Sequence, residues 1–175
     1  MKSKKVLESF GSLVAGSGLA LAVCTSLAAA GDTTSDGYFG WLSVGAVYPM
    51  DDDHIYWVGQ FSGIVGDRGE ATVLNNASVQ CPGSLFINTK DGTAKGAGYC
   101  AFVTTSGDKA YGSWECEGGA PMSGKSCDGT LAYISGTGKL AGITGGNRFE
   151  ASTVAFHSDG TGSGYSMLHY GFSVP

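Results

Sequence analysis

The sequence predicts an all-β fold, a small antiparallel eight-stranded β-barrel that follows a cleaved signal peptide. Short apolar runs recur along the chain and are separated by Gly and Asp-Gly turns. No segment carries a sustained apolar stripe at helical spacing with capping residues. The 30 Gly residues further disfavour long helices, because Gly costs about 1 kcal/mol per helical position relative to Ala.

The apolar runs place the strands. Eight are expected, with a ninth near the C-terminus: 38–47, 54–65, 70–80, 84–88, 97–104, 109–117, 129–135, 147–156 and 163–173. The stretch 70–88 could instead form one strand bent at Pro82-Gly83. Turns are expected at four sites: Asp91-Gly92, Ser106-Gly107-Asp108, Asp128-Gly129 and Asp159-Gly160.

Many short strands indicate either a sandwich or a barrel. Gly residues inside the strands, such as Gly59 and Gly63, favour the barrel because they permit the bends that a small closed sheet needs. Closure also removes the exposed edges of an open sheet.

The N-terminus has the layout of a secretory signal peptide. Lysines at positions 2, 4 and 5 precede an apolar stretch over 13–29, which ends in small residues before Gly31. Gly16 and Gly18 interrupt this stretch, and a membrane anchor would need a longer span. Lipidation at Cys24 is disfavoured by the preceding Val23. We therefore expect a signal peptide over 1–30, a flexible leader over 31–37 and a single domain over 38–175, located in the periplasm or secreted.

Removal of residues 1–30 changes the charge balance. The remaining chain would hold seven basic and fourteen acidic residues, a formal net charge of −7. This negative charge argues against nucleic acid as a partner, and against a membrane surface once the signal is cleaved.

Four cysteines follow the signal segment, namely Cys81, Cys100, Cys116 and Cys127. An even number in an exported chain predicts two disulfides, and four cysteines allow three connectivities. We favour Cys81–Cys100 with Cys116–Cys127, because each pair closes a local hairpin or loop. The alternative is a zinc site, but the usual Cys-x2-Cys pairs are absent.

One segment resembles a known family. Residues 134–145, Ile-Ser-Gly-Thr-Gly-Lys-Leu-Ala-Gly-Ile-Thr-Gly, followed by Phe149, resemble a stretch of the allene oxide cyclase barrel-like superfamily, and dirigent proteins carry a similar one. The stretch 98–116 resembles the preceding hairpin in exported bacterial members. The resemblance implies an eight-stranded, calycin-like barrel with an apolar interior, often trimeric in plant members. It also implies cofactor-free cyclisation, coupling or isomerisation of hydrophobic small molecules, and no catalytic residue can be carried over.

Aromatic residues in the expected strands could fill the barrel or line a pocket for a hydrophobic ligand. Because successive side chains of a strand point to opposite faces, Trp57 and Phe61 are expected on the same face of their strand, whereas Tyr111 and Trp114 are expected on different faces of theirs. The candidate ligand-binding residues are Trp57, Phe61, Tyr99, Phe102, Tyr111, Trp114 and Tyr133.

Candidates for other chemistry are sparse. Glu115 and Glu150 lie within strand-like sequence, where burial would raise the pKa of a carboxyl group and suit it to acid–base work. His54, His157 and His169 lie on different strands, and no pair has the short spacing of a metal site, so no metal or other cofactor is expected. Gly136-x-Gly138 lacks the strand–turn–helix context of a nucleotide site.

These observations favour three functions: a cofactor-free isomerase or cyclase, a non-catalytic carrier, and a structural or self-assembling barrel. A carboxylate facing a cavity would favour the enzyme. A cavity without ionisable groups would favour the carrier, and a filled interior would favour the structural role.

Overall fold

A computed structural model describes residues 31–33, 36–121 and 123–175 of the 175-residue chain. The expected signal peptide, residues 1–30, lies outside the described residues.

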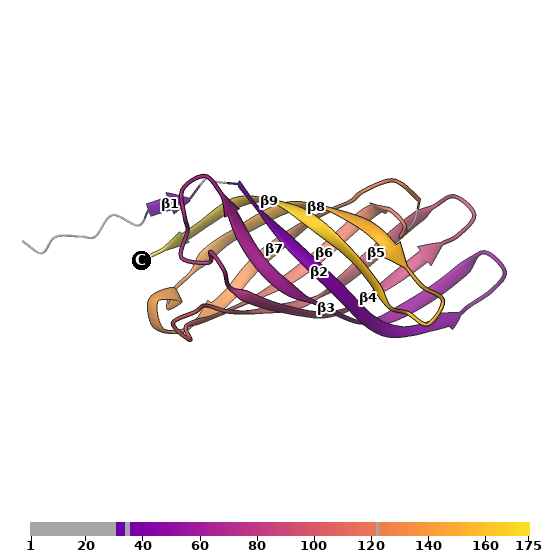
Figure 1. The fold of residues 1–175 in the computed structure, drawn as a ribbon, viewed down its shortest axis with the longest axis horizontal. Helices are drawn as coiled ribbons and strands as arrows, with labels where there is room; N and C mark the ends of the chain where they lie inside the picture. Colours follow the sequence, from indigo (N-terminus) through magenta and orange to yellow (C-terminus); the bar gives the residue numbers. More distant parts are fainter. Residues whose placement is uncertain (1–30, 34–35, 122) are drawn as a thin grey trace, which may run out of the picture.

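Eight long strands close into an antiparallel barrel, as the sequence predicts (Figure 1). Each strand pairs with the next along the chain, and β9 pairs with both β8 and β2, which closes the sheet. The strands are β2 (Asp36–Pro49), β3 (His54–Arg68), β4 (Ser78–Asn88), β5 (Thr93–Val103), β6 (Lys109–Gly119), β7 (Cys127–Gly136), β8 (Thr144–Phe156) and β9 (Gly162–Val174). A short strand, β1 (Gly31–Thr33), adds to β9.

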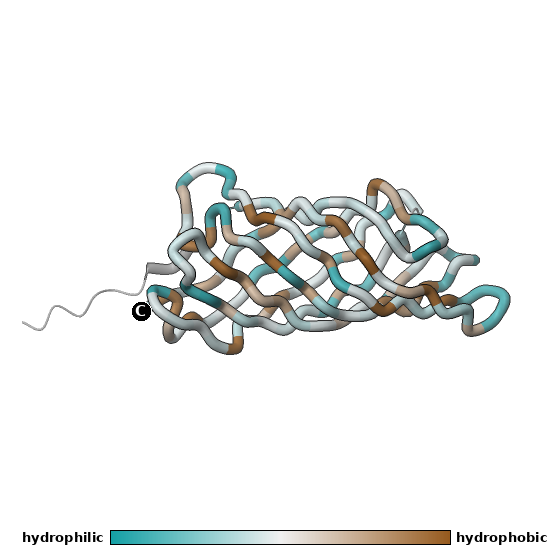
Figure 2. The backbone as a smooth tube through the Cα atoms, turned by 60° about the horizontal axis from the view of Figure 1, so that its bottom comes forward, coloured by the Kyte–Doolittle hydropathy of each residue, from teal (hydrophilic) through white to brown (hydrophobic). Residues whose placement is uncertain are grey.

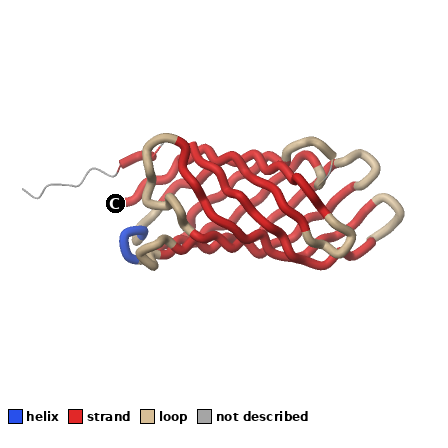
Figure 3. Tube along the Cα trace, viewed as in Figure 1, coloured by secondary structure: helices blue, strands red, loops and turns tan. Residues whose placement is uncertain are grey.

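The two ends of the barrel differ. The closed end carries the loops 69–77, 104–108 and 137–143 together with the C-terminus, and the rim end carries the loops 50–53, 89–92, 120–126 and 157–161. At the closed end lies η1 (Gly138–Leu140), a single turn of 3-10 helix (Figure 3). No helix in the described part of the chain is long and apolar enough to cross a membrane.

Side chains alternate between the interior and the outer surface of the barrel, because successive residues of a strand point to opposite faces. Hydropathy accordingly changes from residue to residue along the strands (Figure 2). In β2, for example, Phe39 and Trp41 are buried whereas Tyr38 and Leu42 are exposed. The core therefore occupies the barrel interior.

Three buried aliphatic side chains close one end of this interior. Loop 69–77 inserts Leu74, and loop 137–143 inserts Leu140 and Ile143. Leu74 and Leu140 have no exposed surface. Backbone hydrogen bonds hold the first loop against β3, with Val65 N–H donating to Ala77 O and Asn76 N–H donating to Val65 O. The closed end is thus a packed plug.

Several expected boundaries need correction. A strand over 70–80 is wrong, since 69–77 is the plug loop and β4 starts at Ser78. β4 continues through Pro82-Gly83, although its pairing with β5 skips Cys81 and Pro82 because Pro has no N–H to donate. Asp128-Gly129 lies inside β7 rather than in a turn. Within the expected leader 31–37, 31–33 form β1, and Asp36 and Gly37 begin β2.

Two disulfides join neighbouring strands, with the pairing favoured from the sequence. Cys81–Cys100 joins β4 to β5 with a Cα–Cα distance of 4.1 Å, and Cys116–Cys127 joins β6 to β7 at 5.7 Å. Each such bridge stabilises a protein by about 2–4 kcal/mol, chiefly by restricting the unfolded chain. Their presence fits a protein that folds in an oxidising compartment.

The plug loop provides the first prediction. Leu74→Ala should lower the free energy of unfolding by about 2–5 kcal/mol, because a fully buried Leu leaves a cavity that its neighbours fill only in part. The adjacent Val73 is 42% exposed, so Val73→Ala is the matched control and should change stability by less than about 0.5 kcal/mol. Denaturant unfolding monitored by circular dichroism measures both. Equal effects of the two substitutions would show that the loop does not plug the barrel.

Candidate functional site

An apolar cavity of about 100 Å³ lies inside the barrel. It reaches Gly119 and Pro121 at the rim end. Toward the closed end it stops before Leu74, Leu140 and Phe172, which are buried but do not line it. Seven aromatic rings contribute to the wall: Phe39, Trp41, Phe61, Phe102, Trp114, Phe149 and Phe156.

Phe61 stands at the centre of the aromatic wall. Its ring centroid lies 5.1 Å from that of Trp41 and 4.9 Å from that of Trp57. The Trp114 ring lies 5.9 Å away with an interplanar angle of 79°. The edge-to-face contacts with Trp41 and Trp114 place positive ring edges against negative ring faces, worth about 0.5–1.5 kcal/mol each beyond the burial of apolar area.

Glycines on neighbouring strands make room for the indoles. The Trp114 ring lies over Gly83 and Gly98, which are cross-strand partners on β4 and β5. Trp41 packs against Gly164 of β9 in the same way. A Cβ atom at any of these glycines would overlap the ring, so the indoles lie flat against the wall and leave the axis of the barrel open.

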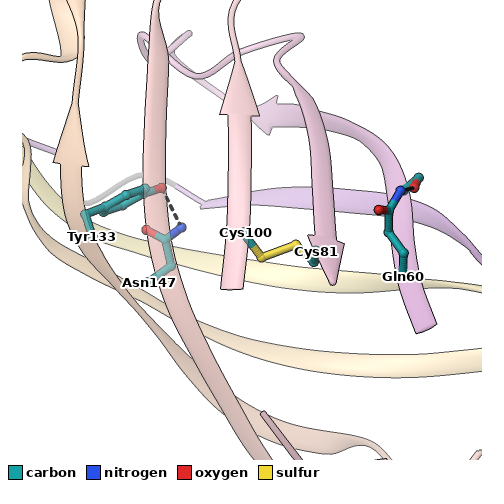
Figure 4. The surroundings of a disulfide bond; sticks show 6 residues. Gln60, Cys81, Cys100, Tyr133 and Asn147 are labelled. Carbon is teal, nitrogen blue, oxygen red and sulfur yellow. Dashed lines mark hydrogen bonds between the residues drawn. A yellow bond between two sulfur atoms is a disulfide. The ribbon is translucent and has the colours of Figure 1, made fainter. Parts of the chain in front are cut away.

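One hydrogen-bonded pair lies at the deep end of the cavity. Asn147 on β8 lines the cavity, and its Nδ2 donates to the hydroxyl of Tyr133 on β7 at 3.1 Å (Figure 4). Both residues are buried, at 5% and 8% exposure. Among the described residues, Asn147 Oδ1 has no hydrogen-bond partner. Trp114 Nε1 likewise has none, but it lies over Gly98 on the wall.

The lining carries no charge. The described residues that border the cavity include no carboxylate, amine, guanidinium or imidazole group. Its polar side chains are Asn147, Ser43, Ser166 and Thr153, together with the indole N–H groups. The cavity therefore suits a neutral ligand, because burying a charge without a partner is costly.

Burial keeps two nearby tyrosines neutral. Desolvation is the main cause that raises the pKa of Tyr133 above its usual 10.0. The pKa of Tyr170 is also raised, first by desolvation and then by the hydrogen bond that its hydroxyl donates to Asp67 at 2.9 Å. Both groups can therefore donate hydrogen bonds at neutral pH.

The sequence candidates for the ligand site divide into three groups. Phe61, Phe102 and Trp114 line the cavity. Trp57 and Tyr133 are buried beside it without lining it, and Trp57 Nε1 donates to Gly160 O in a loop of the rim end.

The third group, Tyr99 and Tyr111, is corrected by the structure. These side chains are 64% and 38% exposed on the outer surface. Strand alternation explains their position, because the inward residues are Cys100 and Phe102 on β5, and Ala110 and Trp114 on β6.

The acid–base candidates also lie outside the barrel. Glu115 and Glu150 are exposed on the outer faces of β6 and β8. His54 pairs with Asp51 at 2.8 Å, and His169 pairs with Asp36 at 2.9 Å. Over the described ranges, no cluster of three His, Cys, Asp or Glu residues could hold a metal ion.

Sequence reasoning missed Phe39, Trp41 and Asn147 as parts of the site. The alternation in β2 could have indicated the first two, since Tyr38 and Leu42 flank them on the outward face. No local signal marks Asn147. It becomes significant only because β7 brings Tyr133 beside it in three dimensions.

Comparisons with known proteins leave the family open. No protein-family model matches the chain, and neither the curated proteins nor the solved structures contain a significant match. The function must therefore be argued from the barrel and its cavity.

The two buried tyrosines provide the second prediction. Their folded-state pKa values exceed the unfolded value of about 10. Their contribution to stability is therefore complete below pH ~10 and is lost as the pH rises above that value. We expect alkaline unfolding by circular dichroism to coincide with a late rise in tyrosinate absorbance. Tyr133→Phe should reduce the amplitude of this rise. If all tyrosines ionised while the protein stayed folded, the prediction that ionisation of these two residues unfolds the barrel would be wrong.

Proposed function

We propose that this protein is an exported binding protein that holds a small uncharged hydrophobic molecule inside its barrel. The observation that carries the proposal is the cavity of about 100 Å³, whose wall is almost entirely apolar and aromatic. Ligand sites of this kind combine apolar walls with a few placed polar groups. Export is supported by the signal-like N-terminal sequence and by the two disulfides.

Binding is better supported than acid–base catalysis. The lining that the structure describes offers no ionisable group, and both candidate carboxylates point away from the cavity. The resemblance of residues 134–145 to the allene oxide cyclase-like barrels supports an isomerase or cyclase as the finer alternative. Such an enzyme would have to act by confining its substrate in a reactive shape.

A cavity-filling substitution tests the proposal. Ala151 lines the cavity from β8, and Ala132 is exposed on the outer face of β7. Ala151→Leu should weaken the binding of a small aromatic probe such as indole by at least about tenfold, because the added atoms occupy ligand space. Ala132→Leu adds the same atoms outside the barrel and should leave binding unchanged. Isothermal titration calorimetry measures both, and undetectable binding of indole, toluene and p-cresol to the natural chain would contradict the proposal.

A second candidate function, self-assembly, is favoured by the outer surface. We define the uncharged face as the outward side chains of 38–48, 56–64, 78–86 and 163–167, on four adjacent strands. None of these segments contains a charged residue. Several of its large side chains are exposed: Tyr38, Leu42, Val44, Tyr48, Tyr56, Val58, Ile64, Phe86 and Tyr165. The outward charges of the other strands include Lys95, Glu115, Glu117, Asp128, Arg148 and Glu150.

A second copy of the chain fits the uncharged face. Four strands about 4.8 Å apart and about ten residues long cover roughly 600 Å². Two such faces would bury about 1,200 Å² in total, which is the lower end of the range for stable protein–protein interfaces. Two such faces can meet without like-charge repulsion, whereas the mostly acidic outward charges of the other strands oppose contact there. The proposed assembly is therefore an isologous dimer.

The dimer provides a further prediction. Leu42 is 66% exposed at the centre of the uncharged face, and Ile134 is 59% exposed on β7. Leu42→Lys should shift the protein from dimer to monomer in size-exclusion chromatography with light scattering, because it buries an unpaired charge in the interface. Ile134→Lys is the matched control and should not change the mass. A monomeric natural chain at millimolar concentration would contradict self-assembly.

A further inference from the structure

We propose that the ligand of the barrel carries a hydrogen-bond donor, and that this donor bonds to Asn147 Oδ1 at the deep end of the cavity. The inference rests on the proposed binding function and narrows its ligand class. Asn147 then serves as the specificity residue of an otherwise apolar site.

The two ends of the Asn147 amide have different surroundings. The Nδ2 end donates to Tyr133, which does not line the cavity. Asn147 itself does line it, and its Oδ1 end is the one for which the described residues supply no hydrogen-bond partner. Figure 4 shows the amide nitrogen of Asn147 joined to the Tyr133 hydroxyl by a dashed line.

The position of Asn147 is unfavourable without a ligand. Its side chain is 5% exposed, and Oδ1 has no partner among the described residues. Its cross-strand partners are Leu131 on β7 and Tyr170 on β9. The Tyr170 hydroxyl is already engaged with Asp67. A buried acceptor that the protein itself leaves unpaired destabilises the fold.

The cavity limits the size and charge of the ligand. A group the size of a water molecule takes up about 10–15 Å³ of cavity volume. The cavity of about 100 Å³ therefore holds about seven to ten non-hydrogen atoms. The uncharged lining excludes carboxylates and ammonium groups as favourable ligands. The class that remains is a small neutral molecule with an apolar body and one donor: a phenol, an alcohol, or an N–H heterocycle.

Three bicyclic probes of nearly the same shape test the inference on the natural full chain. Indole carries an N–H donor, indene carries no polar group, and benzofuran carries only an acceptor. Isothermal titration calorimetry should show indole binding about tenfold more tightly than either of the others, the effect of one hydrogen bond to a buried acceptor.

Two variants then test whether the preference for indole depends on Asn147. Asn147→Leu keeps the shape of the side chain and removes the acceptor, so it should abolish the preference for indole while indene binds at least as well as before. Gln80→Leu is the matched control, since it replaces an amide by Leu at an exposed position of β4 that does not line the cavity. It should leave the ratio of indole to indene affinity unchanged.

The outcomes separate the two proposals. Equal binding of indole and indene by the natural chain would overturn the role of Asn147 while leaving the binding function standing. Tighter binding of benzofuran than of indole would overturn the donor requirement, because the site would then present a donor of its own. Failure of all three probes to bind would overturn the binding function and the ligand class together. The comparison on the natural chain decides the inference even if Asn147→Leu does not fold.

Discussion

The structure depends on the packing of large aromatic rings against glycines inside a closed sheet. An eight-stranded barrel has an interior just wide enough to be filled by side chains, and three indoles with several phenyl rings would overfill it if they pointed to the axis. Gly83, Gly98 and Gly164 let Trp114 and Trp41 lie flat on the wall. The same packing stabilises the barrel and leaves a cavity inside it.

The barrel is asymmetric along its axis. Leu74, Leu140 and Ile143 seal one end with apolar side chains from two loops, while the lining extends to Gly119 and Pro121 at the other. This asymmetry gives the cavity a direction, with a rim and a floor. Asn147 lies near the floor, where a ligand that enters from the rim would place its leading group. The Asn147 side chain is buried there, and in such surroundings a hydrogen bond is electrostatically stronger than in water.

The barrel is also asymmetric around its circumference. Four adjacent strands present an uncharged outer face, and the other four carry most of the outward charges. The Cys81–Cys100 disulfide joins β4, at the edge of the uncharged face, to β5. The Cys116–Cys127 disulfide joins β6 to β7, two of the strands that carry outward charges. The described lining of the cavity, by contrast, is uncharged and mostly apolar. The cavity and the uncharged outer face thus lie on opposite surfaces of the same sheet, and a substitution can change one without the other.

The sequence by itself determined the strands, the barrel class and the favoured disulfide pairing, because these follow from local alternation, turn residues and short loop spacing. It misplaced the strand over 70–80, because that stretch is apolar enough for a strand yet packs as the plug loop. It also placed Tyr99 and Tyr111 in the site by residue type, although their neighbours Phe102 and Trp114 set the inward face. Only the tertiary structure decided that a cavity remains and that Asn147 meets Tyr133 there. Both depend on which residues of neighbouring strands lie side by side, whereas the alternation within one strand fixes only the face to which each side chain points.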